Sequence, residues 1–388
     1  MIKKHLFVYL FAALAMGGVF TSCGDDNDDP IVNPEVKPEP KPEPEVVCPI
    51  AETTFTGKNG LTLSYSGQPM LGKVVKFTPD ASNATKATLV LSGDNFSLLT
   101  AETAIAGVVP GELTTTLNVD LTIDGEKVSF QGKDENEGRV IEYKGEATKT
   151  SLILDLDVTM PTNDLTGKTF SLIAKNPLTI VWDAEPMNIP IFTEPYSIEN
   201  LLKMVLGFAK VEDKPLPEYL LTVFNQVSFL SDGNIQAKYK NKVADEESKT
   251  SPLNVATYAV KGDKILVYVN PIQIQSMKTK AGIAEVLPVL LKSVNEMLAN
   301  GIPVTYNAKE GKLEVYLDET TLLPLLKTVK PLFEDEETVK LLTGLIAKNA
   351  GEMAGLVSVI VPSVLNSLPN VIDTTNDIHL GINLEEVK

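Results

Sequence analysis

Residues 113–131 read LTTTLNVDLTIDGEKVSFQ and contain the clearest strand signal in the chain. Apolar and polar residues alternate through this stretch, which is typical of a strand with one buried face. The predicted apolar face consists of Leu113, Leu117, Val119, Leu121 and Ile123. Asp124-Gly125 then predicts a tight turn into a second strand at residues 127–131. We therefore expect antiparallel β-structure around this hairpin.

A second alternating segment supports the same architecture. Its apolar positions are Leu152, Leu154, Leu156 and Val158. The intervening Asp155 and Asp157 would lie on the opposite face, where paired carboxylates could bind a metal or act as acid and base, but are more often solvated. We predict that residues 51–162 form an antiparallel β-sandwich or a barrel-like domain of about eight strands.

Residues 163–388 mix strand and helix patterns. A strand is expected at residues 178–182, and helices are expected at residues 198–209, 283–299, 322–333 and 337–348. The strands do not alternate regularly with crossover helices, which favours an α+β domain over a parallel α/β one. The predicted fold class is thus α+β, with a larger α+β domain following the β-domain.

An internal repeat lies within this second domain. Residues 257–270 align with residues 305–318 at an offset of 48. The matched residues include the pairs Lys261 and Lys309, Lys264 and Lys312, and Tyr268 and Tyr316. Each copy reads as a hairpin followed by a helix-rich segment, which indicates a duplicated hairpin-helix unit.

Net charge and the small numbers of histidine and cysteine exclude several classes of function. The formal net charge is −17, and loss of residues 1–22 would remove Lys3 and Lys4 and bring it to −19. Nucleic-acid binding is therefore not expected, because it requires basic surfaces. The chain has two histidines, His5 and His379, and too few cysteines and histidines for a zinc site, so we predict no metal and no cofactor. His379 falls on the polar side of an alternating segment and is interpreted as a solvent-facing strand residue.

The first residues predict export. Lys3 and Lys4 precede an uncharged run of 14 residues, 6–19, which is shorter than the roughly 20 residues of a membrane-spanning helix. We interpret residues 1–22 as a signal peptide. Phe20-Thr21-Ser22-Cys23 resembles the bacterial lipobox, which implies that Cys23 is lipidated and anchors the protein to a membrane. A secreted protein with a coincidental cysteine is the alternative.

Residues 23–50 are predicted to be an acidic, proline-rich stalk. Its twenty residues 30–49 could extend up to about 60 Å in a polyproline conformation. The acids at residues 25–29 resemble the export signal of Bacteroides-type surface lipoproteins, although Gly24 replaces the usual serine. We expect an outer-membrane protein exposed at the cell surface, with the periplasmic face as the alternative.

Several segments of the body resemble Bacteroides-type surface lipoproteins that carry a domain of unknown function. They are residues 56–65, 72–79 and 253–258, which are strand and turn patterns. The resemblance implies no catalytic residues.

Three functions remain open. The first is a non-catalytic binding protein whose ligand is a glycan, a lipid or a protein. Its glycan version is weakened by the scarcity of aromatic residues, since sugar platforms favour exposed Trp and Tyr and Trp182 is the one tryptophan. Its lipid version would use an apolar ligand or partner groove formed by Met353, Leu356, Val357, Ile360 and Leu365, although such stripes are usually core. The second is a structural or accessory subunit of an envelope assembly. The third is a hydrolase with paired carboxylates, for which Asp155, Asp157, Asp183 and Glu185 are candidates.

Overall fold

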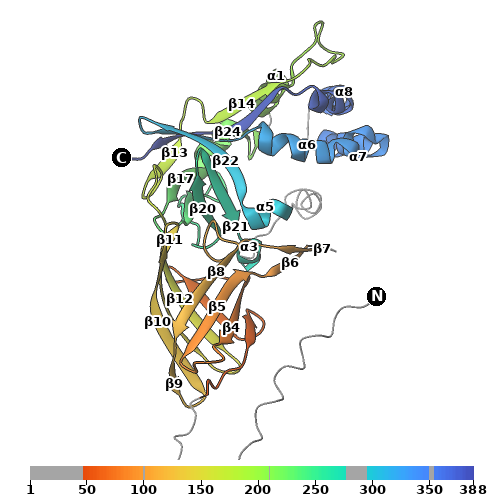
Figure 1. Cartoon of the computed structure of the whole chain (residues 1–388). Coiled ribbons are helices and arrows are strands. Elements are labelled where there is room, and N and C mark those ends of the chain that lie inside the picture. Colours follow the sequence, from red (N-terminus) through yellow and green to blue (C-terminus); the bar gives the residue numbers. More distant parts are fainter. Residues whose placement is uncertain (1–46, 99–100, 209, 277–294, 349–353) are drawn as a thin grey trace, which may run out of the picture. The chain divides into compact units, whose positions relative to one another are not determined.

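The computed structural model describes residues 47–98, 101–208, 210–276, 295–348 and 354–388. The predicted signal peptide, Cys23, most of the predicted stalk and much of the predicted helix at 283–299 lie outside these residues. The described residues belong to one compact unit. Within this unit we distinguish an N-terminal lobe, which contains β1–β12, from a C-terminal lobe, which contains all later elements (Figure 1).

Two principal sheets form the N-terminal lobe. The first is four-stranded, in the order β1 (Thr53–Thr56), β4 (Lys73–Pro79), β5 (Lys86–Gly93), β8 (Thr114–Asp120). The second is six-stranded, in the order β3 (Gln68–Pro69), β2 (Leu61–Tyr65), β12 (Leu152–Thr159), β11 (Arg139–Ala147), β10 (Lys127–Asn136), β9 (Thr122–Asp124). A separate pair consists of β6 (Asn95–Leu98) and β7 (Ala101–Ala104).

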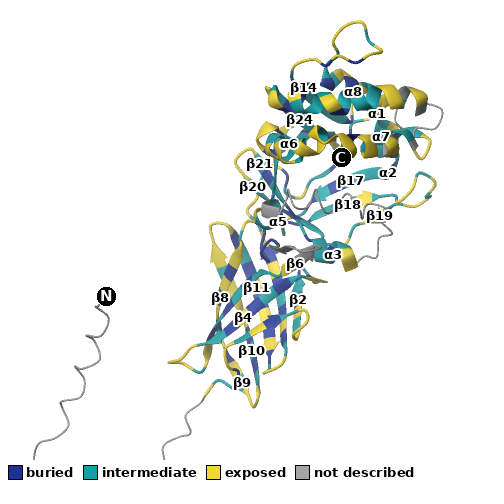
Figure 2. Cartoon of the chain, turned by 90° about the vertical axis from the view of Figure 1, so that its right-hand side faces the viewer, coloured by how far each residue is buried: buried dark blue, intermediate teal, exposed yellow. Residues whose placement is uncertain are grey.

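The apolar faces of both principal sheets meet in one core. Leu117 and Val119 of β8 pack there with Leu152, Leu154 and Leu156 of β12. Buried and exposed positions alternate along both strands, and Figure 2 shows the alternation on β8. This burial is the main source of stability for such a lobe, since each fully buried leucine contributes roughly 2 kcal/mol.

The strand assignment from the sequence was wrong at Leu113, whose side chain is 57% exposed. Thr115 takes the inward position and is 1% exposed. Its hydroxyl can be buried because it donates to Glu112 Oε2 at 2.5 Å, and Glu112 also accepts from Arg139 Nε at 3.1 Å. Satisfied polar groups tolerate burial, so a threonine can replace an apolar residue here.

The lobe is also not antiparallel throughout. β2 and β12 pair in parallel, with Leu61 opposite Leu152 and Leu63 opposite Leu154. Nine strands, β3 to β11, lie between β2 and β12 in the sequence. Parallel strands need a long connection, and this one is long enough.

The C-terminal lobe is built on one sheet of ten strands, which we call the large sheet. Its order is β19 (Lys249–Thr250), β18 (Ile235–Tyr239), β17 (Phe224–Phe229), β13 (Thr169–Leu172), β24 (Asp377–Glu386), β23 (Lys312–Leu317), β22 (Ile302–Lys309), β21 (Lys264–Val269), β20 (Ala256–Lys261), and β14 (Leu178–Asp183) also pairs with β24. The large sheet curls, and Thr257 of β20 forms an antiparallel bridge to Asn234, just before β18.

The hairpins of the internal repeat lie side by side in the large sheet. We call β20–β21 the first hairpin and β22–β23 the second hairpin, and β21 pairs antiparallel with β22. Lys261 opposes Lys264 at the end of the first hairpin, and Lys309 opposes Lys312 at the end of the second. The lysine pairs matched in the sequence therefore occupy equivalent register positions.

Helices cover one end of the large sheet. They are α1 (Ile198–Phe208), α6 (Glu319–Glu334), α7 (Glu336–Lys348) and α8 (Ala354–Asp373). Trp182 of β14 and Ile378 of β24 form a core with Val371 of α8 and residues of α1 and α6. α8 continues through Pro362 and Pro369.

Shorter elements complete the C-terminal lobe. They are β15 (Lys210–Val211), β16 (Lys214–Pro215), α2 (Leu216–Val223), α3 (Pro271–Ser276) and α5 (Asn295–Asn300). No helix among the described residues is both long and apolar enough to cross a membrane. The chain is thus an α+β protein dominated by sheet.

Buried polar groups join the two lobes. Asn254 is 1% exposed, and its Nδ2 donates to Gln68 O at 3.1 Å and to Pro69 O at 3.2 Å. Asn254 has φ of 64°, a left-handed conformation that asparagine tolerates better than most residues. Asn270 Nδ2 donates to Leu71 O at 2.9 Å. These bonds link side chains of the C-terminal lobe to backbone carbonyl groups of the N-terminal lobe.

Candidate functional site

One face of the large sheet carries polar side chains on neighbouring strands. The strand register sets Thr305 opposite Tyr316, Asn307 opposite Glu314, and Glu314 opposite Asn383. Because alternate residues of a strand point to opposite faces, these side chains share one surface while Val315 and Ile382 pack into the core behind it. We define this polar face as Lys264, Thr305, Asn307, Lys309, Lys312, Glu314, Tyr316, His379 and Asn383.

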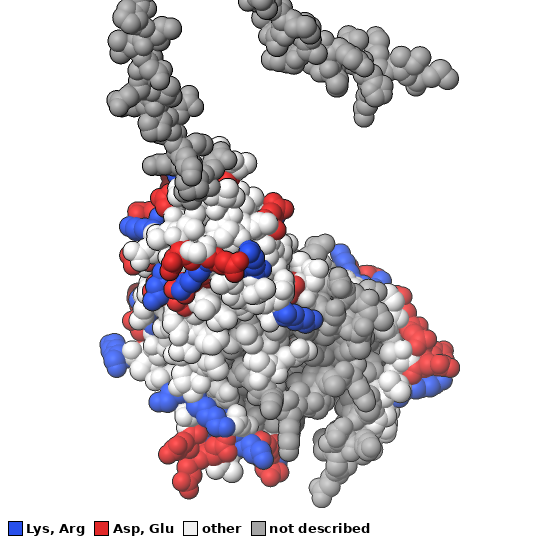
Figure 3. All heavy atoms as spheres, turned by 90° about the horizontal axis from the view of Figure 1, so that it is seen from below, with Lys and Arg blue, Asp and Glu red and all other residues white. Residues whose placement is uncertain are grey.

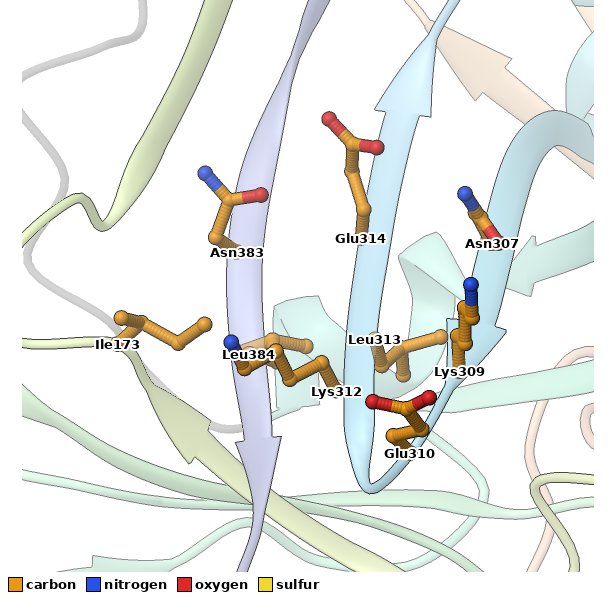
Figure 4. Close-up of a pocket in the computed structure, with 9 residues that line it drawn as sticks. All are labelled: Ile173, Asn307, Lys309, Glu310, Lys312, Leu313, Glu314, Asn383 and Leu384. Carbon is orange, nitrogen blue, oxygen red and sulfur yellow. The ribbon is translucent and has the colours of Figure 1, made fainter.

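A hollow of about 370 Å³ lies on the polar face. Its lining residues are Ile173, Asn307, Lys309, Glu310, Lys312, Leu313, Glu314, Asn383 and Leu384 (Figure 4). In Figure 4 the side chains of Asn307, Glu314 and Asn383 stand on three adjacent strands, β22, β23 and β24. The hollow thus presents amide and carboxylate groups from three adjacent, hydrogen-bonded strands.

Hydrogen bonds position the polar groups of the hollow. Thr179 Oγ1 lies 2.9 Å from Glu314 Oε1 and 3.1 Å from Asn383 Oδ1. Asn383 Nδ2 donates to Asn176 O at 3.0 Å. Glu314 Oε2 has no hydrogen-bond partner among the described residues, so this oxygen can accept a bond from a ligand.

An aromatic pair adjoins the hollow. The rings of Tyr316 and His379 have centroids 4.8 Å apart and are tilted by 33°. His379 Nε2 lies 2.9 Å from Asp377 Oδ1. Burial, together with the carboxylates of Glu314 and Asp318, raises the pKa of Tyr316 above its usual value. The tyrosine therefore stays neutral near pH 7.

The sequence correctly predicts which face of the strand carries His379, but it does not predict the contacts that His379 makes there. The side chain shares the polar face with Asn383, but it is only 32% exposed and is held by Asp377 and Tyr316. Gly381 lies between His379 and Asn383 on β24, where an added Cβ would be 2.1 Å from Val315 O. Glycine thus allows β23 to approach at this point.

A partly buried ion pair lies at one side of the polar face. Lys264 Nζ binds Asp318 Oδ2, and Thr305 Oγ1 donates to the same oxygen at 2.7 Å. Burial opposes ionisation of Asp318, but hydrogen bonds from Lys264, Thr320 and Thr305 outweigh it and hold the pKa of that carboxyl well below its usual range. Asp318 also accepts from Thr321 N at the start of α6, as a helix N-cap does.

The lysines at the end of the second hairpin have different surroundings. Lys309 and Lys312 are exposed, directly oppose each other and form no ion pair with any described residue. Both line the hollow, and both also line a second hollow of about 250 Å³ beside Phe170 and Glu386. Like charges directly opposite each other on a sheet are unfavourable.

The predicted apolar groove maps to α8. Met353 lies outside the described residues, and Leu356 lies in α8 without a described side chain. Val357 is partly buried, Ile360 packs against the core around Trp182, and Leu365 is 9% exposed. Ile360 and Leu365 are thus placed in packed surroundings.

The carboxylates considered for hydrolysis lie in two separate regions, on β12 and at the end of β14. Asp155 and Asp157 are on β12 in the N-terminal lobe, where Asp155 accepts from Ser64 Oγ. Asp183 ends β14 and accepts from Asn376 Nδ2 at 3.3 Å, while Glu185 accepts from Asn370 Nδ2 at 3.3 Å. Within the described parts of the chain, no three histidine, cysteine, aspartate or glutamate side chains are grouped to hold a metal ion.

Charged side chains are mixed elsewhere on the surface. On the face seen in Figure 3, lysines and arginines lie among aspartates and glutamates and form no continuous basic patch. No family model, no curated protein and no solved structure matches this chain. Functional inference therefore depends on the geometry of the polar face.

Proposed function

We propose that this is a non-catalytic binding protein, anchored by a lipid on Cys23 and displayed at the cell surface, which holds its ligand on the polar face. The observation that carries the proposal is the hollow over β22–β24, lined by Asn307, Glu314 and Asn383. Small-molecule sites are concave and have a few fixed polar groups, which this surface provides.

Hydrogen bonds at the hollow position the side chains that would meet a ligand. The Thr179 hydroxyl has one proton, which Glu314 Oε1 and Asn383 Oδ1 share as acceptors, and Asp377 Oδ1 lies 2.9 Å from His379 Nε2. Such contacts keep side chains in one geometry, so a ligand meets a preorganised surface and less ordering entropy is lost on binding.

The proposed anchor agrees with a surface role. The lipobox resemblance at Cys23, the acids at residues 25–29 and the proline-rich stalk would hold the body away from the lipid. Labelled palmitate should be incorporated into the wild-type protein and not into Cys23→Ala. A Cys48→Ala variant is the matched control and should be labelled normally; equal labelling of Cys23→Ala would contradict the anchor.

The binding proposal is tested by native mass spectrometry of the full chain purified from its own envelope. We expect an added ligand mass that is lost from Asn383→Ala, because that variant removes an amide from the hollow. Asn366→Ala, an exposed asparagine on α8, should retain the ligand. A wild-type protein without ligand, or a ligand kept by Asn383→Ala, would count against the polar face.

We also propose that the polar face arose by duplication of a hairpin-helix unit within an α+β domain that follows the β-domain. The two hairpins pair with each other, and each is followed by a helix whose cap is a matched residue, Asn270 or Asp318. The offset of 48 residues relates these two caps as well.

An accessory role in an envelope assembly is the second candidate. It is favoured by apolar side chains that the helices leave exposed, notably Leu341 at 64% and Val359 at 47%. Exposed apolar groups of this kind mark interaction surfaces when they are contiguous. Crosslinking in intact cells should then give a defined adduct that Leu341→Asp abolishes; capture of no partner would dismiss this candidate.

A further inference from the structure

The hollow combines donors and acceptors in balance. Its charged lining consists of two lysines, Lys309 and Lys312, and two glutamates, Glu310 and Glu314. An ammonium group only donates and a carboxylate only accepts, whereas a hydroxyl group does both. A ligand rich in hydroxyl groups can therefore satisfy every polar group here, while a highly charged ligand would meet like charge.

An aromatic surface lies next to these groups. Tyr316 is two residues from Glu314 on the same face of β23, which places them about 7 Å apart along the strand. Its ring is half-buried and packs against the ring of His379. A neutral tyrosine ring offers a flat apolar face with a polar edge.

A lipid fits this surface poorly. An acyl chain over Asn307, Glu314 and the two lysines would remove these groups from water without giving them hydrogen bonds, which costs several kcal/mol. The volume of about 370 Å³ is at the lower end of the range for small-molecule sites. The site thus suits a polar ligand that lies across the strands.

We infer that the polar face binds a saccharide, with one sugar ring on Tyr316 and the next over the hollow, where its hydroxyl groups meet Glu314, Asn383 and Asn307. This inference rests on the proposed binding function and specifies its ligand class. The free Glu314 Oε2 accepts from a sugar hydroxyl, and the lysines donate to others. β23 lies between β22 and β24, so the platform and the hydrogen-bonding groups keep a fixed spacing.

The test uses the purified full chain and labelled oligosaccharides in fluorescence anisotropy. The probes are maltoheptaose, cellohexaose, xylohexaose and mannohexaose, which are all uncharged. We expect saturable binding of at least one probe. Tyr316→Ala should weaken it about tenfold or more, through loss of the platform. Glu314→Gln should weaken it roughly tenfold, through loss of a charged acceptor.

Two matched variants act as controls. Tyr239→Ala on β18 and Glu247→Gln, an exposed glutamate, should bind as the wild type does. Tyr316→Phe keeps the ring and should retain affinity within about threefold, which guards against a folding defect in Tyr316→Ala.

The outcomes separate this inference from the proposed function. If the wild type binds no probe at millimolar concentration, or if Tyr316→Ala and Glu314→Gln bind unchanged, the saccharide inference is overturned. A co-purified lipid or peptide that depends on Asn383 would then leave the binding function standing with another ligand class. If no ligand is found whose binding depends on Asn383, both the saccharide inference and the proposed binding function are overturned.

Discussion

The two hairpin units of the large sheet occupy equivalent positions but make different contacts at their caps. The first hairpin leads through Asn270 into α3, and the second leads through Asp318 into α6. Asn270 donates its amide to Leu71 O of the N-terminal lobe, whereas Asp318 binds the ammonium of Lys264 from the first hairpin. The amide at the first cap thus links the two lobes, whereas the carboxylate at the second cap forms an ion pair beside the polar face.

The lysines show the same divergence. Lys264 is held by Asp318, but its counterpart Lys312 has no third unit to supply a carboxylate and lines the hollow instead. The second hairpin therefore ends in a lysine charge that no described carboxylate pairs and that a ligand can use. This difference predicts that equivalent substitutions in the two units have unequal effects.

The largest effect is expected for Asp318→Ala. It leaves Lys264, whose side chain is 25% exposed, without its carboxylate, and it removes the cap of α6. We expect a loss of about 3 kcal/mol in the free energy of unfolding, near the lower end for a broken buried ion pair. Asn270→Ala should cost only about 1 kcal/mol, as for a lost cap. Urea unfolding at pH 7 measures both, and equal losses would contradict the comparison.

Lys73 is a buried lysine that contacts backbone carbonyl groups, in contrast to Lys264, which is paired with the carboxylate of Asp318. Lys73 on β4 is 4% exposed, and its Nζ donates to Ala106 O and Gly107 O at 2.9 Å each. Burial lowers the pKa of Lys73 to about 8, from 10.5 in the unfolded chain. Between these values the unfolded chain binds more protons, so stability should rise with pH, by up to on the order of 3 kcal/mol.

Lys73→Met removes this titration and is the control. Urea midpoints measured from pH 7 to pH 10 should rise for the wild type relative to the variant. Parallel profiles would show that Lys73 is not the titrating group.

Asn270→Asp makes the cap of the first unit resemble that of the second without providing a lysine. The new carboxylate would face Leu71 O, now bonded by the amide at 2.9 Å, in a position that is 7% exposed. We expect a loss of about 2 kcal/mol at pH 7. Because burial disfavours the charged form, the loss should shrink as pH falls towards 4. A penalty that does not change with pH would argue against this explanation.

The smallest effect is expected for Lys309→Ala. It relieves the opposition of two ammonium groups at the end of the second hairpin, so stability should change by less than about 0.5 kcal/mol and rise if it changes. The same urea titration measures it. A loss above about 1 kcal/mol would mean that Lys309 has a structural partner.

Alternation within a strand was readable from the sequence because burial follows a two-residue period. Leu152, Leu154 and Leu156 are buried as expected. Leu113 was assigned wrongly, because the hydrogen bond from Thr115 to Glu112 makes a polar residue acceptable in the core. The parallel pairing of β2 with β12 depends on contacts between distant segments, which local patterns do not encode.

The polar face could be anticipated only in part. The alternation in residues 377–384 located Asn383 and His379, and the repeat matched Lys264 with Lys312. The approach of Thr179 to Glu314 and Asn383 joins residues 135 and 204 positions apart. Such approaches are set by strand order and register, so the hollow had no signature within any one segment.

Difference hydrogen exchange of the full chain, with and without the oligosaccharide mixture, tests the polar face most directly. We predict slower exchange in peptides that cover residues 302–317 and 377–386, while residues 336–348 of α7 and the strands of the N-terminal lobe exchange unchanged. Protection confined to the helices or to the N-terminal lobe would contradict it.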